Sequence, residues 1–191
     1  MSDNFAARLN QILPRLISPE LRTNSGLGNE IGFYVFNYPP ERELDVRRHV
    51  QLLRAQIARQ HTELRVSEVN LFDLLVDYLR RRKILDPALK LQREKGNTEL
   101  QRALKGSLHE EKVAQEFIAA AKPDEHDMVF MTGVGNVWPL LRTHTLLNNL
   151  HALMQAKPLI VFYPGMYDGQ TLKLFGRLND QNYYRAFKLV A

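Results

Sequence analysis

Two short apolar runs separated by a helix-length segment constrain the fold of this chain more than any other feature. Residues 128–132 (MVFMT) lead into the Gly-rich turn TGVGN, and residues 159–163 (LIVFY) lead into a Pro-Gly turn. Leucines recur at helical spacing between the two runs. Uniformly apolar strands are typical of a parallel sheet that helices cover on both faces. A strand–helix–strand unit is therefore predicted, with both strands ending in exposed loops.

The first half of the chain repeats this alternation. Residues 33–36 are predicted to form a buried strand, and a helix follows Pro39 and Pro40. Residues 64–69 are predicted as a second strand, with Asn70 as the N-cap of the next helix. Strands that alternate with helices predict an α/β fold with a mainly parallel, three-layer, Rossmann-like sheet.

Two further segments complete the predicted domain. Residues 171–175 and 184–189 alternate around an Asn-Asp turn, which predicts an antiparallel C-terminal hairpin at the edge of the sheet. The charged block 86–125 is interrupted by Gly96 and Gly106. We interpret it as a helical insertion or lid within a single α/β domain that spans residues 1–191.

The composition excludes several classes of function. The 191 residues include no cysteine, which excludes disulfides, thiolate metal sites and cysteine nucleophiles. The N-terminal stretch is amphipathic and unlike a signal peptide. No stretch approaches the roughly 20 consecutive apolar residues that a membrane span needs. A cytoplasmic protein without a membrane-bound segment is expected.

Two groups of basic residues raise the question of DNA binding, because the chain carries a net charge of +5. Cations near the end of a helix also complement its dipole, so the same residues are explained without a partner. Direct contact with DNA therefore stays an alternative. The two groups are Arg80, Arg81, Arg82 and Lys83, and Arg47, Arg48, Arg54 and Arg59.

The TGVGN turn resembles a phosphate-binding loop in its glycines but lacks the other required residues. A P-loop needs a lysine followed by serine or threonine, and here Val137, Trp138 and Pro139 follow the turn. Trp138 also occupies the third glycine position of the dinucleotide-binding pattern. The glycines are therefore expected to serve turn geometry, and Asn136 is predicted to cap the next helix. Binding of an anion or nucleotide without hydrolysis remains an alternative.

Metal and catalytic sites are not predicted. His144, Asn148 and His151 share one helical face, but no third local ligand completes a metal site. No serine–histidine–acid set or carboxylate pair follows from the spacing of residues. We expect no enzymatic activity and no cofactor.

The loops that follow the predicted parallel strands supply the candidate binding residues, because such loops gather at the carboxyl edge of the sheet. Trp138 is interpreted either as an exposed anchor for a partner or as a core residue. Asp168 either contributes to binding or stabilises the Asp-Gly turn. The candidate binding residues are Gly133, Gly135, Asn136, Trp138, Arg142, Asp168 and Arg185.

Four long stretches resemble the BrxB family of the BREX phage-defence systems. They are GLGNEIGFYVFNYPPERELDVR (26–47), VNLFDLLVDYL (69–79), TGVGNVWPLLRTHTLLNNLH (132–151) and YPGMYDGQTLKLFGRLNDQNYYRAFKLV (163–190). The resemblance implies a component of a defence island that also encodes a DNA methyltransferase, a large ATPase and an alkaline-phosphatase-like protein. It implies a part in phage restriction and host DNA methylation, and it supplies no accepted catalytic residues.

Two classes of function follow from this resemblance together with the motifs. The first is a non-enzymatic assembly subunit that binds other BREX proteins, above all the alkaline-phosphatase-like component. The alternative is a degenerate nucleotide- or anion-binding regulator, or a subunit that contacts DNA within a complex.

Overall fold

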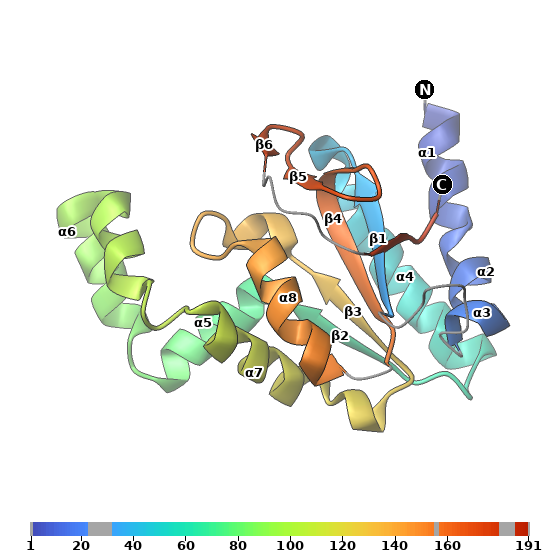
Figure 1. The fold of residues 1–191 in the computed structure, drawn as a ribbon, viewed down its shortest axis with the longest axis horizontal. Coiled ribbons are helices and arrows are strands. Elements are labelled where there is room, and N and C mark those ends of the chain that lie inside the picture. Colours follow the sequence, from blue (N-terminus) through green and yellow to red (C-terminus); the bar gives the residue numbers. More distant parts are fainter. Residues whose placement is uncertain (1, 23–31, 155–156, 180–185, 191) are drawn as a thin grey trace.

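A parallel sheet forms the centre of the structure, a computed structural model that describes residues 2–22, 32–154, 157–179 and 186–190. Its strands lie in the order β2-β3-β4-β1-β7, and every neighbouring pair in this series is parallel (Figure 1). The predicted α/β fold with a mainly parallel sheet is therefore confirmed. The strands are β1 (Phe33–Tyr38), β2 (Val66–Asn70), β3 (Met128–Thr132), β4 (Leu159–Tyr167) and β7 (Phe187–Lys188).

The apolar strands form the centre of this sheet because both of their faces are covered. Every residue of β3 is buried. Val161 of β4 lies in register with Val35 of β1 on one side and with Met131 of β3 on the other. Continuous apolar runs are what a doubly covered parallel sheet requires, since no side chain of a central strand faces water.

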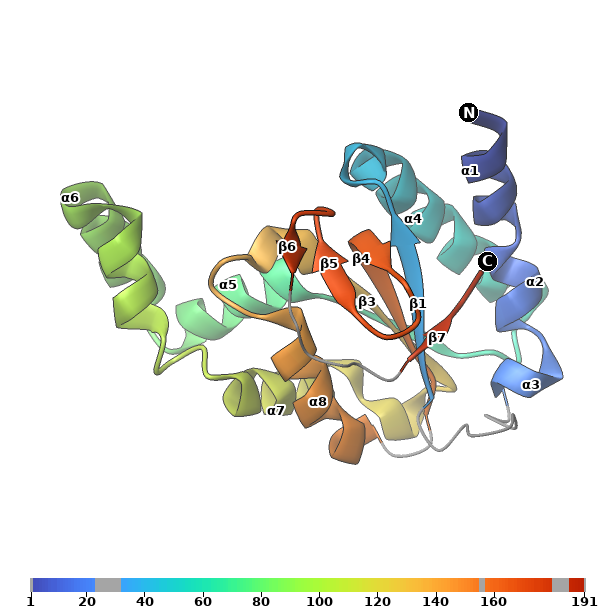
Figure 2. The ribbon, with the colours of Figure 1, turned by 45° about the horizontal axis from the view of Figure 1, so that its top comes forward.

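Two helical layers cover the two faces of the sheet (Figures 1 and 2). Tyr34 and Phe36 of β1 belong to one core, and Phe33 and Val35 belong to the other. The first core includes side chains of α1 (Ser2–Asn10), α2 (Ile12–Leu16), α3 (Pro19–Arg22) and α4 (Glu43–Gln60). The second core includes side chains of α5 (Leu71–Arg81), α7 (Glu110–Ala121) and α8 (Thr143–Met154).

The helix α6 (Leu85–Leu104) extends away from these layers (Figures 1 and 2). Its buried residues are Ala88 and Leu104, near its two ends, and Gly96 interrupts it with a φ of +81°. The helix α7, in contrast, packs against α5, α8 and β2. The interpretation of residues 86–125 as an insertion or lid within a single domain stays a prediction.

The C-terminal pairing differs from the predicted hairpin. β5 (Leu172–Leu174) pairs antiparallel with the end of β4 and with β6 (Leu178–Asn179). β7 instead lies parallel to β1 at the far edge of the sheet, where the Leu189 N–H donates to the Val35 carbonyl. The predicted pairing of 171–175 with 184–189 is therefore wrong. The turn closes earlier, since Phe175 and Gly176 both have positive φ, and Phe187 packs against Tyr34 of β1.

Candidate functional site at the carboxyl edge of the sheet

The Gly-rich turn after β3 is closed by contacts within the chain. A Cβ on Gly133 would lie 2.2 Å from Asn70 Oδ1, and a Cβ on Gly135 would lie 2.9 Å from Pro164 Cγ and 3.0 Å from Phe175 Cε1. Glycine is therefore required for close approach to the ends of β2 and β4. The backbone of this turn is packed against its own chain.

The same turn leads into a 3-10 helix, η3 (Val134–Val137), and α8 begins at Thr143. The prediction that Asn136 caps the next helix is therefore wrong. Trp138 has an extended backbone, with φ −71° and ψ 138°, and it precedes Pro139. Proline disfavours the helical conformation of the residue before it, and the extended backbone of Trp138 interrupts the chain between η3 and α8.

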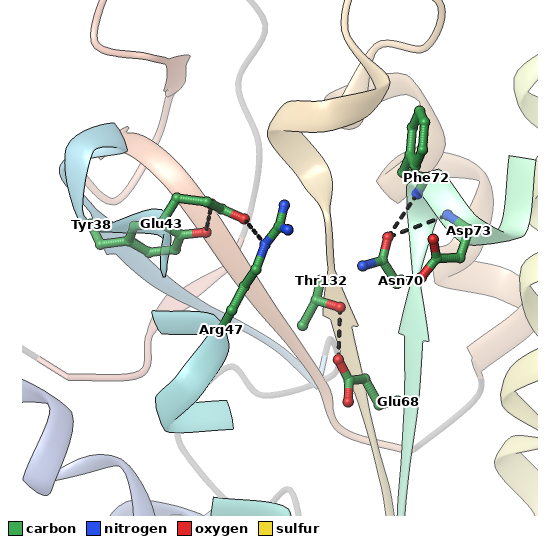
Figure 3. Close-up of polar contacts among 8 residues, drawn as sticks. All are labelled: Tyr38, Glu43, Arg47, Glu68, Asn70, Phe72, Asp73 and Thr132. Carbon is green, nitrogen blue, oxygen red and sulfur yellow. Dashed lines mark hydrogen bonds and ion pairs between the residues drawn. The ribbon is translucent and has the colours of Figure 1, made fainter. Parts of the chain in front are cut away.

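Asn70 is the N-cap of α5, as predicted (Figure 3). Its Oδ1 accepts hydrogen bonds from the backbone N–H groups of Phe72, at 3.0 Å, and Asp73, at 3.3 Å. The same oxygen lies where a Cβ on Gly133 would point, so one side chain lies between the end of β2, the start of α5 and the Gly-rich turn. This contact fixes the loops after two neighbouring strands relative to each other.

Large apolar side chains are exposed around this edge. We call Phe72, Trp138, Met166 and Phe175 the edge surface. The exposed fractions are 45% for Phe72, 46% for Trp138 and 59% for Met166, and Phe175 is half-buried. The Trp138 and Phe175 rings meet edge to face, with centroids 6.4 Å apart. Exposed apolar groups that gather in one region of a surface are typical of interaction sites.

These four residues come from separate elements that end at the carboxyl edge. Phe72 begins α5 after β2, and Trp138 follows η3, which lies against α5 and β4. The N–H of Phe175 donates to the Pro164 carbonyl, which places this residue beside the end of β4. Sequence reasoning had selected Trp138 and missed the other three. The available signal for Phe72 was an aromatic residue between the N-cap Asn70 and Asp73, in the first turn of α5.

Asp168 is engaged in its own turn. Its Oδ1 accepts from the N–H groups of Gln170 and Thr171, and its Oδ2 accepts from the Thr171 hydroxyl. These hydrogen bonds, above all those from Thr171, lower the pKa of Asp168 to about 2. The geometry supports the interpretation of Asp168 as a residue that stabilises the turn. Arg185 lies outside the described residues.

Polar contacts on the α4 face connect the strand ends to that helix (Figure 3). The Tyr38 hydroxyl donates to Glu43 at 2.6 Å, and Arg47 donates to the same carboxylate at 2.9 Å. Burial, followed by the negative charge of Glu43, raises the pKa of Tyr38. Glu68 accepts from the Thr132 hydroxyl at 2.9 Å and from Arg54 at 2.7 Å. These polar groups have structural partners.

Half of the basic residues in the two groups noted in the sequence are paired with acids. Arg47 and Arg54 bind Glu43 and Glu68, as described above. At the end of α5, the Arg80 and Arg81 guanidinium groups contact Asp77 and Glu116, and the Arg82 guanidinium lies over the Tyr78 ring. The carboxylates of these pairs compensate part of the positive charge of α4 and α5.

The two histidines of α8 contact different groups. His144 is buried, with Nε2 3.0 Å from the Thr145 hydroxyl. His151 stacks on Phe33 with centroids 4.4 Å apart, and burial lowers its pKa. Within the described ranges, no group of three histidine, cysteine, aspartate or glutamate residues is placed to hold a metal ion. In the same part of the chain, no helix has the length and apolar character needed to cross a membrane.

The fold and this edge define an α/β protein with an apolar candidate interaction surface at the carboxyl ends of its parallel strands. The family model described as "BREX protein BrxB" matches residues 67–189. A BREX protein BrxB of Bacillus cereus (strain H3081.97) is 38% identical over 187 residues, which cover 96% of each chain. Another from Escherichia coli O9:H4 (strain HS) is 37% identical over 183 residues, which cover 96% of this chain and 90% of the relative. No solved structure matches the chain.

The chain belongs to the BrxB family and is therefore a component of a BREX phage-defence system. The resemblance noted in the sequence is confirmed. The matched region includes the Gly-rich turn, the segment before α8 and the β4–β5 hairpin.

Proposed function

We propose that this protein is a non-enzymatic assembly subunit that binds another BREX protein through the edge surface. The observation that carries the proposal is the exposure of Trp138 beside Phe175, with Phe72 and Met166 exposed on α5 and β4, the elements that contact η3. Trp is the residue most favoured as a binding hot spot, and its half-exposed ring packed on Phe175 forms a rigid anchor. Loops that hold such side chains on a rigid scaffold are typical of recognition.

The geometry of the Gly-rich turn favours recognition over phosphate binding. A phosphate-binding turn presents free backbone N–H groups to its ligand. Here Asn70 lies against Gly133, and both Pro164 and Phe175 lie against Gly135. These contacts give the two glycines a structural reason that needs no ligand.

The family supports the choice of partners. A BREX component works with other BREX proteins, and the alkaline-phosphatase-like component is the first candidate for direct contact. The subunit would act in the cytoplasm, where phage restriction and host DNA methylation take place. In this proposal any contact with DNA is made only within a complex, and the arginine pairs of α4 and α5 agree with that view.

Trp138→Ala tests the docking surface. We expect the variant to lose about 2 kcal/mol of binding, which weakens capture of the partner roughly thirtyfold. The measurement is affinity purification of the tagged protein from cells that carry the complete defence island. The melting temperature of the variant is measured alongside, because the Trp138 ring also packs on Phe175 and only a folded variant reports on binding.

Leu52→Ala is the matched control. Leu52 is an exposed apolar side chain on α4, away from the edge surface, and its loss should leave both capture and phage resistance intact. If stably folded Trp138→Ala and Phe72→Ala proteins retain every partner and full resistance, docking takes place elsewhere.

A further inference from the structure

A second feature lies next to the edge surface. The end of α6, the start of α7 and the segment before α8 line a cleft of about 490 Å³ that is open to solvent. In both views of the ribbon the segment before α8 extends from the sheet toward α6 (Figures 1 and 2). The cleft therefore joins parts of the chain about 40 residues apart, and Arg142 contributes to its wall.

The charge of this cleft is not compensated within the described residues. Its lining includes Arg102, Lys105 and Arg142, and Glu110 is the one acid among the lining residues. Arg102 donates to Glu99 at 2.8 Å. Lys105 and Arg142 make no ion pair with any residue that the structure describes. This distinguishes them from Arg47, Arg54 and Arg81, each of which has an acidic partner.

The cleft also has an apolar component. Leu108 is buried, Leu140 is half-buried and Pro139 is exposed, and all three belong to the lining. A nucleic-acid backbone is bound by rows of cations and offers little for such apolar groups. A peptide with both acidic and aliphatic side chains matches the cations and the apolar wall together. Pro139 directly follows Trp138, so the segment that carries Trp138 also lines the cleft.

We propose that this cleft binds an acidic segment of the partner protein, whose carboxylates pair with Lys105 and Arg142. The apolar side chains of the same partner contact Trp138 and the rest of the edge surface. This inference rests on the proposed function and adds that the partner carries an acidic segment next to its apolar contact residues. Unpaired cations beside an apolar anchor favour both fast association and correct orientation of an acidic partner.

Charge reversal tests the cleft within the defence system. Arg142→Glu and Lys105→Glu, each on an exposed side chain, should reduce capture of the partner by about tenfold or more. Arg48→Glu is the matched control, because Arg48 is an exposed cation on α4 outside the cleft. It makes the same change in net charge and should retain the partner. Equal melting temperatures would show that all three variants fold.

The outcomes separate this inference from the proposed function. If Trp138→Ala loses the partner while Arg142→Glu and Lys105→Glu keep it, the proposed docking function is supported. The proposal that the cleft binds an acidic segment of the partner is then wrong. If Trp138→Ala and Phe72→Ala both keep every partner and full resistance, the proposed docking function is wrong. In that case, peptide binding by the purified protein tests whether the cleft binds an acidic segment.

The direct probe is a short fluorescein-labelled peptide of glutamate and leucine, followed by fluorescence anisotropy with the purified full chain. We expect binding that weakens with salt, falls about tenfold in Arg142→Glu and is absent for a glutamine–leucine peptide. No binding of the acidic peptide by the unmodified chain would overturn the inference. The inference would also be overturned if duplex DNA, or inorganic phosphate at the same ionic strength, displaced the peptide and this displacement depended on Arg142.

Discussion

At the scale of single residues, Gly133 and Gly176 share a backbone conformation and differ in their surroundings. Their φ values are +70° and +69°, but a Cβ on Gly133 would collide with Asn70, whereas a Cβ on Gly176 would have no neighbour closer than 3.9 Å. We expect Gly176→Ala to cost about 1 kcal/mol of stability, from the left-handed backbone. Gly133→Ala should cost about 2–3 kcal/mol, because it also displaces the N-cap of α5.

Urea unfolding of the two alanine variants would measure this difference. Asn70→Ala supplies the comparison, because it removes the cap while both glycines of the turn stay in place, and it should cost about 1 kcal/mol. Equal losses for Gly133→Ala and Gly176→Ala would contradict the close packing between the turn and the end of β2.

Asp168 gives a prediction for acidic pH. Its pKa is lowered to about 2 in the folded protein, against about 4 in an unfolded chain. Its stabilising contribution is therefore complete above pH 4, and it is lost as the pH falls from about 4 through about 2. Asp168→Asn retains an acceptor for the N–H groups of Gln170 and Thr171 but loses the charge.

The difference in unfolding free energy between wild type and Asp168→Asn should shrink over this pH window. Thermal or urea unfolding at a series of pH values would measure it. A difference that stays constant down to pH 2 would show that the ionised carboxylate does not stabilise the turn.

At the scale of whole elements, α6 and α7 differ in how they are held. Side chains of α7 that include Val113, Ala114 and Phe117 are buried against the sheet layer, whereas the central turns of α6 are exposed. Helices without a buried face open readily, because little apolar contact opposes local unfolding. We expect the amides of the central turns of α6 to exchange much faster than those of α7. Hydrogen exchange with mass spectrometry would measure this, and equal protection would indicate that α6 is covered by another chain.

At the scale of the whole molecule, the arrangement of charge opposes strong binding of DNA by the isolated protein. The net charge of +5 is small, and the arginines of α4 and α5 that pair with acids cannot act as a continuous basic face. We expect binding of duplex DNA at physiological salt to be no tighter than about 10⁻⁴ M. Anisotropy titration with labelled DNA would test this, and tight binding that falls steeply with salt would contradict it.

Local patterns in the sequence determined the fold class, one helix cap and the family of this protein. The apolar runs of β1, β3 and β4 predicted a parallel α/β sheet, since burial of a strand on both faces is recorded in its own residues. The N-cap role of Asn70 was predictable, because an N-cap side chain binds N–H groups within the next three residues of the chain. The long motifs identified the family for the same reason, as they require no knowledge of spatial neighbours.

The tertiary structure decided which distant segments meet. Alternation in residues 171–175 is compatible with any neighbouring strand, and packing selected the end of β4 and β6 as its partners. Trp138 was a candidate by its type, but its exposure and its contact with Phe175 depend on the path of the β4–β5 hairpin. Lys105 and Arg142 share a cleft because α6 ends beside the segment before α8. Such contacts are chosen by the packing of the entire chain, so they leave no signal in the local sequence.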